Sequence, residues 1–377
     1  MPIEDSPIAL AVLSLLRDRH NVLISGPPGT GKSRLLNEVA RAFEDAPPIG
    51  PVHVPGAAVA IPKVPPVVGP VAGNQPSPER KSRKVFRTVF HQNSKYRDFV
   101  TGLVPVIGSK ADGGGTSFRI VAGTLYRASE HARSKDGASL LIIDEINRGP
   151  AVQVFGGSIV AIESDKRLAA DGTKGPNTQF FELTGPEKGE LIEYALPHHL
   201  YILAAMNQAD TSVEPLDVAF LRRWAPFPLQ PSSSVLRAYY GLTPKPEGAL
   251  PEKPASAKDV YEAAEQAWRA VNGRIRLGRG PEFQIGHGIL MGRKVAATTD
   301  QDALRDVAES WSLVRAHIEE VFFGDLRGIA AVLNIGAVGH PYKLSDTTFG
   351  DEPRLEIVGP EVISAENIFT LLRAVAG

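Results

Sequence analysis

The sequence of 377 residues contains no cysteine, which excludes disulfides, thiolate metal sites and thiol nucleophiles. It also lacks a charge imbalance, because 41 lysines and arginines stand against 42 aspartates and glutamates. A chain so balanced is not a polycation that coats nucleic acid, so contact with DNA requires a local patch or a partner. No apolar run approaches the roughly 20 residues that span a bilayer, and the acidic first residues do not resemble a signal peptide. We therefore expect a cytoplasmic protein that makes no contact with a membrane.

The hydrophobic pattern predicts two domains with different secondary structure. Short apolar segments predict strands at residues 21–25, 84–91, 139–144 and 199–205. Segments with helical spacing of apolar residues lie at 8–18, 33–43, 257–272, 302–319 and 364–376. Strands that alternate with helices favour a parallel sheet flanked by helices. The fold class is therefore an α/β core at residues 1–230, followed by a smaller helical lid and C-terminal domain at residues 231–377.

Two segments rich in proline interrupt this pattern. Residues 47–83 are expected to form an insertion within the core, extended or partly ordered, because proline removes backbone donors and blocks helices and central strands. Residues 241–258 are expected to be a connector within or after the hinge to the second domain.

Residues 26–33 read GPPGTGKS and match the phosphate-binding pattern G-x-x-x-x-G-K-[ST] at every position. Glycines let successive backbone N–H groups point at phosphate oxygens, and the following helix adds its positive dipole end. Lys32 is expected to reach the β- and γ-phosphates, and the Ser33 hydroxyl can ligate Mg²⁺. The predicted nucleotide-binding residues of this segment are Gly26, Pro27, Pro28, Gly29, Thr30, Gly31, Lys32, Ser33 and Arg34.

The predicted strand at residues 139–144 ends in two adjacent carboxylates, Asp144 and Glu145. Asp144 can hold Mg²⁺ together with Ser33, and Glu145 can polarise a water molecule for attack on the γ-phosphate. We therefore expect Mg²⁺ as cofactor and a nucleoside triphosphate as substrate.

Four further stretches carry a resemblance to known protein families. Residues 144–148 read DEINR, which is similar to both the McrB-like and the MoxR-like branches of the AAA+ proteins. Residues 205–210 read AMNQAD and resemble the Met-Asn-x-x-Asp signature of the GTPase motor subunits of McrBC restriction systems. Residues 90–103, FHQNSKYRDFVTGL, are similar to that family's Phe-His-x-x-x-x-Tyr-x-Asp-Phe-[Val/Ile]-x-Gly stretch, and residues 283–287 to its second sensor region.

This resemblance implies roles for several further residues. Asn207 would be the first sensor, which hydrogen-bonds the attacking water or the γ-phosphate. Asp210 either belongs to the same signature or begins the following turn. At least one of Arg222 and Arg223 would be an arginine finger that reaches a nucleotide bound by the neighbouring subunit.

Two other residues have open interpretations. His287 either approaches the nucleotide from the lid or packs within a turn. Arg148 either contacts a partner, helps to position Glu145 or is an exposed turn residue.

Among the basic stretches, residues 79–84 either face a pore that holds nucleic acid or form a solvated loop edge. Arg274, Arg276 and Arg279 are expected in a glycine-rich loop.

The function that the resemblance implies is the motor subunit of an McrBC-like restriction or anti-phage system. Such a subunit would form a homo-oligomeric ring, expected to be hexameric, and hydrolyse GTP or ATP. It would work with an McrC-like or nuclease partner, with possible DNA contact through that partner or the pore. The alternatives are a MoxR-type ATPase chaperone that remodels a protein complex and a nucleotide-binding assembly scaffold with little turnover.

Overall fold

The computed structural model describes every residue except 1–5, 46–79, 108–115, 210–215, 246–248 and 294. Most of the predicted insertion at 47–83, and Asp210, lie outside the described residues. The chain divides into two units. The first comprises Met1–Ser25 and Lys32–Pro228, and the second comprises Gly26–Gly31 and Leu229–Gly377.

The first unit is built on a five-stranded sheet with the order β2-β5-β8-β1-β9. These strands are β1 (Asn21–Gly26), β2 (Ser82–Val89), β5 (Gly137–Asp144), β8 (Leu200–Asn207) and β9 (Ala225–Pro228). The pairs β2–β5, β5–β8 and β1–β9 are parallel. β1 is buried along its whole length, as the apolar run of a central parallel strand requires. Because all these strands run in one direction, Asp144 and Asn207 end two neighbouring strands at the same edge of the sheet.

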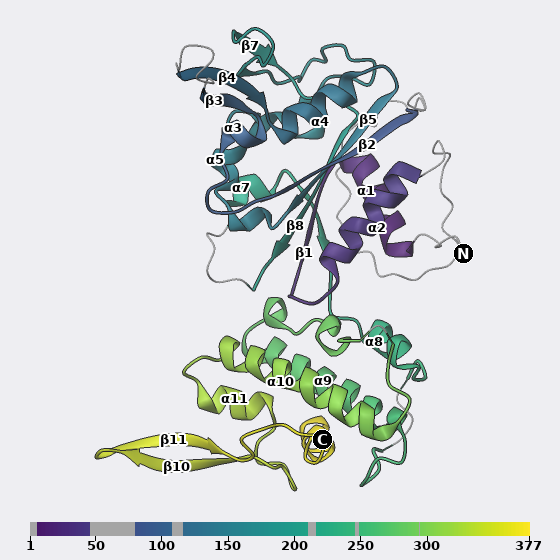
Figure 1. Ribbon diagram of the computed structural model, residues 1–377, viewed down its shortest axis with the longest axis vertical. Helices are drawn as coiled ribbons and strands as arrows, with labels where there is room; N and C mark the ends of the chain where they lie inside the picture. The colour runs from purple at the N-terminus through teal and green to yellow at the C-terminus, as the bar shows by residue number, and fades with distance from the viewer. Residues whose placement is uncertain (1–5, 46–79, 108–115, 210–215, 246–248, 294) are drawn as a thin grey trace. The chain divides into compact units, whose positions relative to one another are not determined.

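Helices cover both faces of this sheet. α1 (Pro7–Arg19) and α2 (Lys32–Asp45) lie on one face and α4 (Thr124–Arg133) on the other (Figure 1). Short helical segments complete the unit: α3 (Tyr96–Phe99), η2 (Ile146–Arg148), α5 (Ala151–Phe155), α6 (Ser158–Ala161), η3 (Ser164–Lys166) and α7 (Val218–Leu221). The parallel sheet flanked by helices confirms the predicted fold class.

The first unit also contains two antiparallel hairpins that the hydrophobic pattern did not predict. One joins β3 (Thr101–Ile107) to β4 (Thr116–Ala122), and the other joins β6 (Phe181–Thr184) to β7 (Leu191–Tyr194). Both lie in stretches where turn residues interrupt short apolar runs, so a sequence window is too short to show their periodicity.

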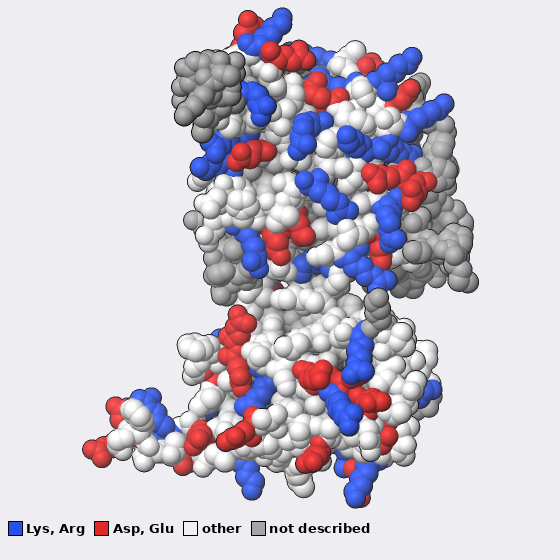
Figure 2. All heavy atoms as spheres, viewed as in Figure 1, with Lys and Arg blue, Asp and Glu red and all other residues white. Residues whose placement is uncertain are grey.

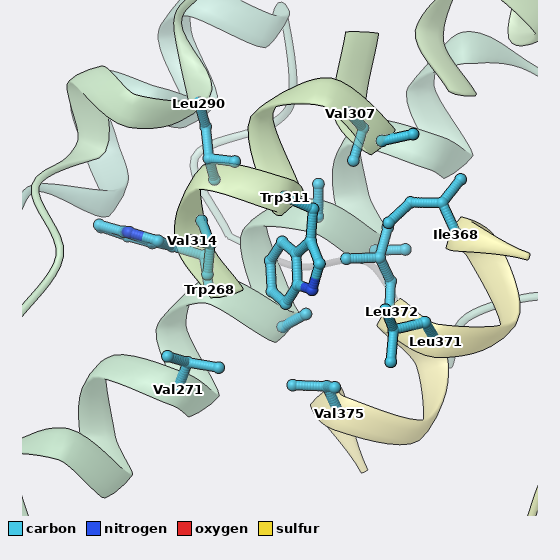
Figure 3. Close-up of a cluster of buried hydrophobic side chains, with 14 of the residues drawn as sticks. Trp268, Val271, Leu290, Val307, Trp311, Val314, Ile368, Leu371, Leu372 and Val375 are labelled. Carbon is cyan, nitrogen blue, oxygen red and sulfur yellow. The ribbon is translucent and has the colours of Figure 1, made fainter. Parts of the chain in front are cut away.

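The second unit is mostly helical. Its helices are α8 (Ser233–Tyr240), α9 (Ala257–Gly278), η4 (Pro281–Phe283), η5 (His287–Leu290), α10 (Asp300–Val321), α11 (Leu326–Val332) and α12 (Ile368–Ala376). α9 begins with a capping box, in which the side chains of Ser256 and Asp259 each accept from the other's backbone N–H. The core lies between α9, α10 and α12, where Trp311 is fully buried among Val307, Val314 and Leu372 (Figure 3).

The expected connector at residues 241–258 begins after Leu229, where the second unit resumes, so its place after the hinge stays a prediction. Two other features of the unit differ from expectation. Arg274 and Arg276 lie in helix α9 rather than in a loop, and Arg274 donates to the carbonyls of Val332 (3.2 Å) and Val375 (2.8 Å). The unit also contains an unpredicted hairpin of β10 (Lys343–Phe349) and β11 (Glu352–Val358), most of whose side chains are exposed.

The surface agrees with the balanced composition. Basic and acidic side chains are intermingled on the face that Figure 2 shows. Among the described residues, no helix combines the length and the apolar character that crossing a membrane requires.

Candidate nucleotide-binding site

The predicted phosphate loop connects β1 to α2, as the motif requires. β1 ends at Gly26, and the 14-residue helix α2 begins at Lys32. Gly29 and Gly31 have positive φ angles of 74° and 87°, a conformation that glycine adopts without the strain that a side chain adds. The Thr30 hydroxyl donates to the Pro27 carbonyl at 2.9 Å and so fixes the turn. This loop and the N-terminus of α2 together form the type of backbone cradle that binds phosphate.

Within the second unit, which includes Gly26–Gly31, a glycine-rich segment lies against the phosphate loop. The N–H groups of Gly286 and Gly288 donate to the carbonyls of Pro28 and Gly29, at 3.0 and 2.8 Å. A Cβ atom at Gly286 would lie 2.0 Å from the carbonyl carbon of Gly29, so only glycine permits this approach.

His287 lies between these two glycines and is buried. Its Nδ1 accepts a hydrogen bond from the Ser232 backbone N–H at 3.2 Å, which places the proton of the neutral ring on Nε2. The ring is therefore both packed and adjacent to the phosphate loop, so its predicted nucleotide contact stays a prediction.

Lys32 carries the positive charge of the site. Its side chain is largely buried, and burial lowers its pKa from the ordinary 10.5 to about 8, an effect opposed by the nearby carboxylates of Glu145 and Asp144. Burial of a cation is unfavourable unless an anion accompanies it, and a polyphosphate is the anion that this cradle would accept.

Two oxygen donors are available for Mg²⁺. Ser33 is exposed in the first turn of α2, and Asp144 ends β5 with its Oδ1 accepting the backbone N–H of Glu145 at 3.0 Å. Hydroxyl and carboxylate oxygens fit the preference of Mg²⁺, which keeps several waters and takes one or two protein ligands together with phosphate oxygens. Among the described residues, no group of three or more His, Asp or Glu side chains could hold a metal by itself.

Glu145 is held in place by side chains from two segments. The Asn207 amide, at the end of β8, donates to both carboxylate oxygens of Glu145 at 2.9 and 3.1 Å. The Arg148 guanidinium forms an ion pair with the same carboxylate at 3.2 Å. Glu145 has a φ angle of 51° and a ψ angle of 44°, a left-handed conformation that is uncommon for a residue with a long side chain. The structure thus brings the predicted base and the predicted sensor into direct contact.

Asn147 is a member of this site that the sequence analysis did not single out. Its buried side chain donates from Nδ2 to the Asn207 carbonyl at 2.9 Å, so that it ties the end of β8 to the turn after β5. Its position in the DEINR stretch at residues 144–148 was the only feature of the sequence that pointed to it. Its role could not be inferred because its partner lies 60 residues away in the chain.

The two predicted finger arginines have different surroundings. Arg222 is exposed at the C-terminal end of α7. The Arg223 side chain is only 8% exposed and forms an ion pair with Glu163 at 3.0 Å. Arg223 also donates to the Ala219 carbonyl. Of the two, therefore, Arg223 is engaged within its own subunit, whereas Arg222 faces solvent.

Comparisons with known proteins indicate the class of protein to which this chain is similar. A family model described as "AAA domain" matches residues 16–154. The chain is 26% identical over 321 residues to the type IV methyl-directed restriction enzyme EcoKMcrB subunit of Escherichia coli (strain K12), covering 83% of this chain and 56% of that protein. It is 30% identical over 236 residues to the type II restriction enzyme BsuMI component YdiS of Bacillus subtilis (strain 168), covering 60% and 62%. The chain therefore spans less than two thirds of the length of these curated relatives.

Among solved structures, C. elegans PCH-2 aligns with 83% of this chain and 71% of its own, at 12% identity and a TM-score of 0.35. A TM-score this low reflects a loose superposition, and the relationship rests on the sequence matches instead.

Proposed function

We propose a motor role for this chain, which is an McrB-like P-loop NTPase of the AAA+ class. In this proposal the chain hydrolyses GTP or ATP and uses the energy to drive a restriction or anti-phage system. The support comes from two relatives whose names describe components of restriction enzymes, and from a site in which the predicted hydrolytic groups converge.

The observation that carries the proposal is the contact between Glu145 and Asn207 beside Lys32. Lys32 and the loop amides would bind the β- and γ-phosphates. The Glu145 carboxylate would accept a proton from a water molecule as the water oxygen attacks the γ-phosphorus and the bond to the nucleoside diphosphate breaks. The Asn207 amide, which already donates to Glu145, would orient the same water or the γ-phosphate.

Ser33 and Asp144 would hold Mg²⁺ by their side-chain oxygens. When bound, this ion would neutralise the charge that develops on the phosphate oxygens. Both side chains come from the ends of rigid elements, which is where precise placement of such ligands is possible.

A neighbouring copy of the chain would complete the site. We assign the arginine finger to Arg222, because Arg223 is already engaged with Glu163 and Ala219. A trans arginine requires an assembly in which each subunit faces the next, and a head-to-tail interface of this kind forms a ring when its rotation closes. We propose that the ring is hexameric and that an McrC-like or nuclease partner stimulates turnover and acts on DNA.

The test is phosphate release from GTP and from ATP, each measured with Mg²⁺ and with EDTA. We expect Mg²⁺-dependent release from at least one triphosphate. Glu145→Gln should lower turnover by a factor of at least about 10² while nucleotide affinity stays nearly unchanged, because general-base catalysis contributes about 10² to 10⁴. Glu182→Gln, a change at an exposed position of β6, is the matched control and should behave like the wild type.

Each rival function has its own outcome in these assays. Tight binding without turnover, with or without a partner, would identify a nucleotide-binding scaffold. Turnover that an McrC-like partner does not alter would favour a MoxR-type chaperone. The absence of affinity for either triphosphate would refute the proposed function altogether.

A further inference from the structure

Arg148 forms an ion pair with Glu145, the residue proposed as the general base. The Glu145 carboxylate must accept a proton from water, yet protein groups already occupy both of its oxygens. Asn207 donates to both oxygens, and the Arg148 Nε lies 3.2 Å from Oε2. These two donors hold the carboxylate in one orientation, which limits how it can turn toward an attacking water molecule.

The backbone adds to this restraint. Glu145 has a left-handed conformation, which persists for a long side chain only where the surroundings hold it. Asn207 is itself held, because the Asn147 side chain donates to its carbonyl. The Glu145 carboxylate is therefore held within reach of Arg148, which follows it at i,i+3 spacing.

Of the two side chains that bind Glu145, only Arg148 could be withdrawn without loss of the proposed chemistry. Asn207 would be needed to orient water or phosphate. Arg148 has no such task, and its side chain is 52% exposed, whereas that of Glu145 is 27% exposed. An exposed guanidinium can turn toward solvent or toward another anion while the carboxylate stays in the site.

We propose that Arg148 is a positioning residue that restrains Glu145 and keeps basal hydrolysis slow. This inference rests on the proposed function, since it concerns the same carboxylate. Glu145 becomes an effective base when Arg148 has turned away, and the unstimulated subunit spends most of its time with the ion pair formed.

The test compares basal turnover of the wild type with that of Arg148→Ala, Arg148→Lys and Arg305→Ala. Arg305 forms an exposed pair with Asp302 at the same i,i+3 spacing, at 3.5 Å, so it controls for the loss of one surface arginine. Loss of an exposed ion pair of this kind is expected to change the rate of hydrolysis by a factor of about two to five. We expect kcat of Arg148→Ala to rise by that factor with KM unchanged. Arg148→Lys, which keeps the charge, and Arg305→Ala should both stay at the wild-type rate.

The double variant Arg148→Ala with Glu145→Gln shows whether the gain passes through Glu145. We expect it to be as slow as Glu145→Gln alone. If Arg148→Ala is equal to or slower than the wild type, or if its gain survives in the double variant, Arg148 does not restrain Glu145. These outcomes differ from failure of the proposed function, in which the wild type itself neither binds nor hydrolyses a triphosphate.

Discussion

The contrast between Arg222 and Arg223 leads to a prediction that separates folding from catalysis. Arg223→Ala should destabilise the first unit, because it removes the partner of the Glu163 carboxylate and the donor to the Ala219 carbonyl. Removing one member of a fully buried ion pair costs about 3 to 5 kcal/mol. Because the Glu163 side chain is 29% exposed and water can rehydrate it, we expect about 2 kcal/mol. For a domain of this size, that loss lowers the melting temperature by about 4 to 8 °C.

Arg222→Ala should show the opposite behaviour. Its exposed side chain contributes little to the fold, so the melting temperature should change by no more than about 1 °C. Phosphate release by the assembled protein should fall by a factor of about 10³ or more, because this is what trans arginines contribute. Nucleotide affinity of the isolated subunit should be retained.

The two readouts are a thermal melt without nucleotide and steady-state phosphate release at protein concentrations where subunits assemble. Arg223→Lys is a useful intermediate variant, because lysine keeps the charge but cannot reproduce the planar arrangement of donors. If Arg223→Ala melts like the wild type and yet loses turnover, our assignment is reversed and Arg223 is the finger. If neither variant affects turnover, no trans arginine lies in this segment.

Three further predictions concern pH and stability. Lys32→Met should abolish triphosphate binding but raise the melting temperature of the nucleotide-free protein by a few degrees. The reason is that burial lowers the pKa of Lys32 from its ordinary 10.5 to about 8, so the charged lysine that predominates at neutral pH is less stable in the folded protein than in the unfolded chain. Burial lowers the pKa of His199 to about 4 and that of His20 well below its ordinary value, so the unfolded chain binds more protons than the folded protein. Stability should therefore be highest above about pH 6.5 and should fall as the pH drops toward 4. Urea titrations at pH 7.5 and 5 would measure this loss, and His199→Gln should reduce it. Ser256→Ala should lower the unfolding free energy of the second unit by about 1 kcal/mol in a urea titration, because it removes the capping box of α9.

The parts of the site that the sequence predicts are those whose residues are adjacent in the chain. The loop at residues 26–33 and the start of α2 follow from a motif with fixed spacing, and Asp144 follows from an apolar strand that ends in a carboxylate. Their shared edge of the sheet follows from the parallel order of the strands. Local pattern and global fold agree here, and such agreement makes sequence inference reliable.

The remaining features depend on contacts between distant residues. The pairing of Arg223 with Glu163 spans 60 positions, and nothing in the local sequence distinguishes Arg223 from Arg222. The glycines at 273 and 278 suggested a loop, yet both lie within α9, where long-range packing by residues such as Trp268 and Val271 outweighs the modest cost of glycine in a helix. The hairpins were not predicted because short strands have little hydrophobic pattern of their own and are stabilised by pairing with each other.

The charges of Lys32, Asp144 and Glu145 affect one another in the candidate site. The carboxylates of Glu145 and Asp144 favour the charged form of Lys32. Burial of the lysine opposes that form more strongly, so the net effect is a lowered pKa. In the proposed function, a bound triphosphate would place negative charge beside Lys32, and its metal ion would place positive charge beside Asp144. The ligand would thus relieve the unfavourable burial of the Lys32 charge. Glu145 also acts on Lys32, but its carboxylate is bound by Asn207 and Arg148 as well. In the proposed function, affinity would depend on Lys32 and Asp144, and the rate of cleavage on the contacts of Glu145. We therefore expect Arg148→Ala to alter the rate of cleavage and to leave nucleotide affinity nearly unchanged.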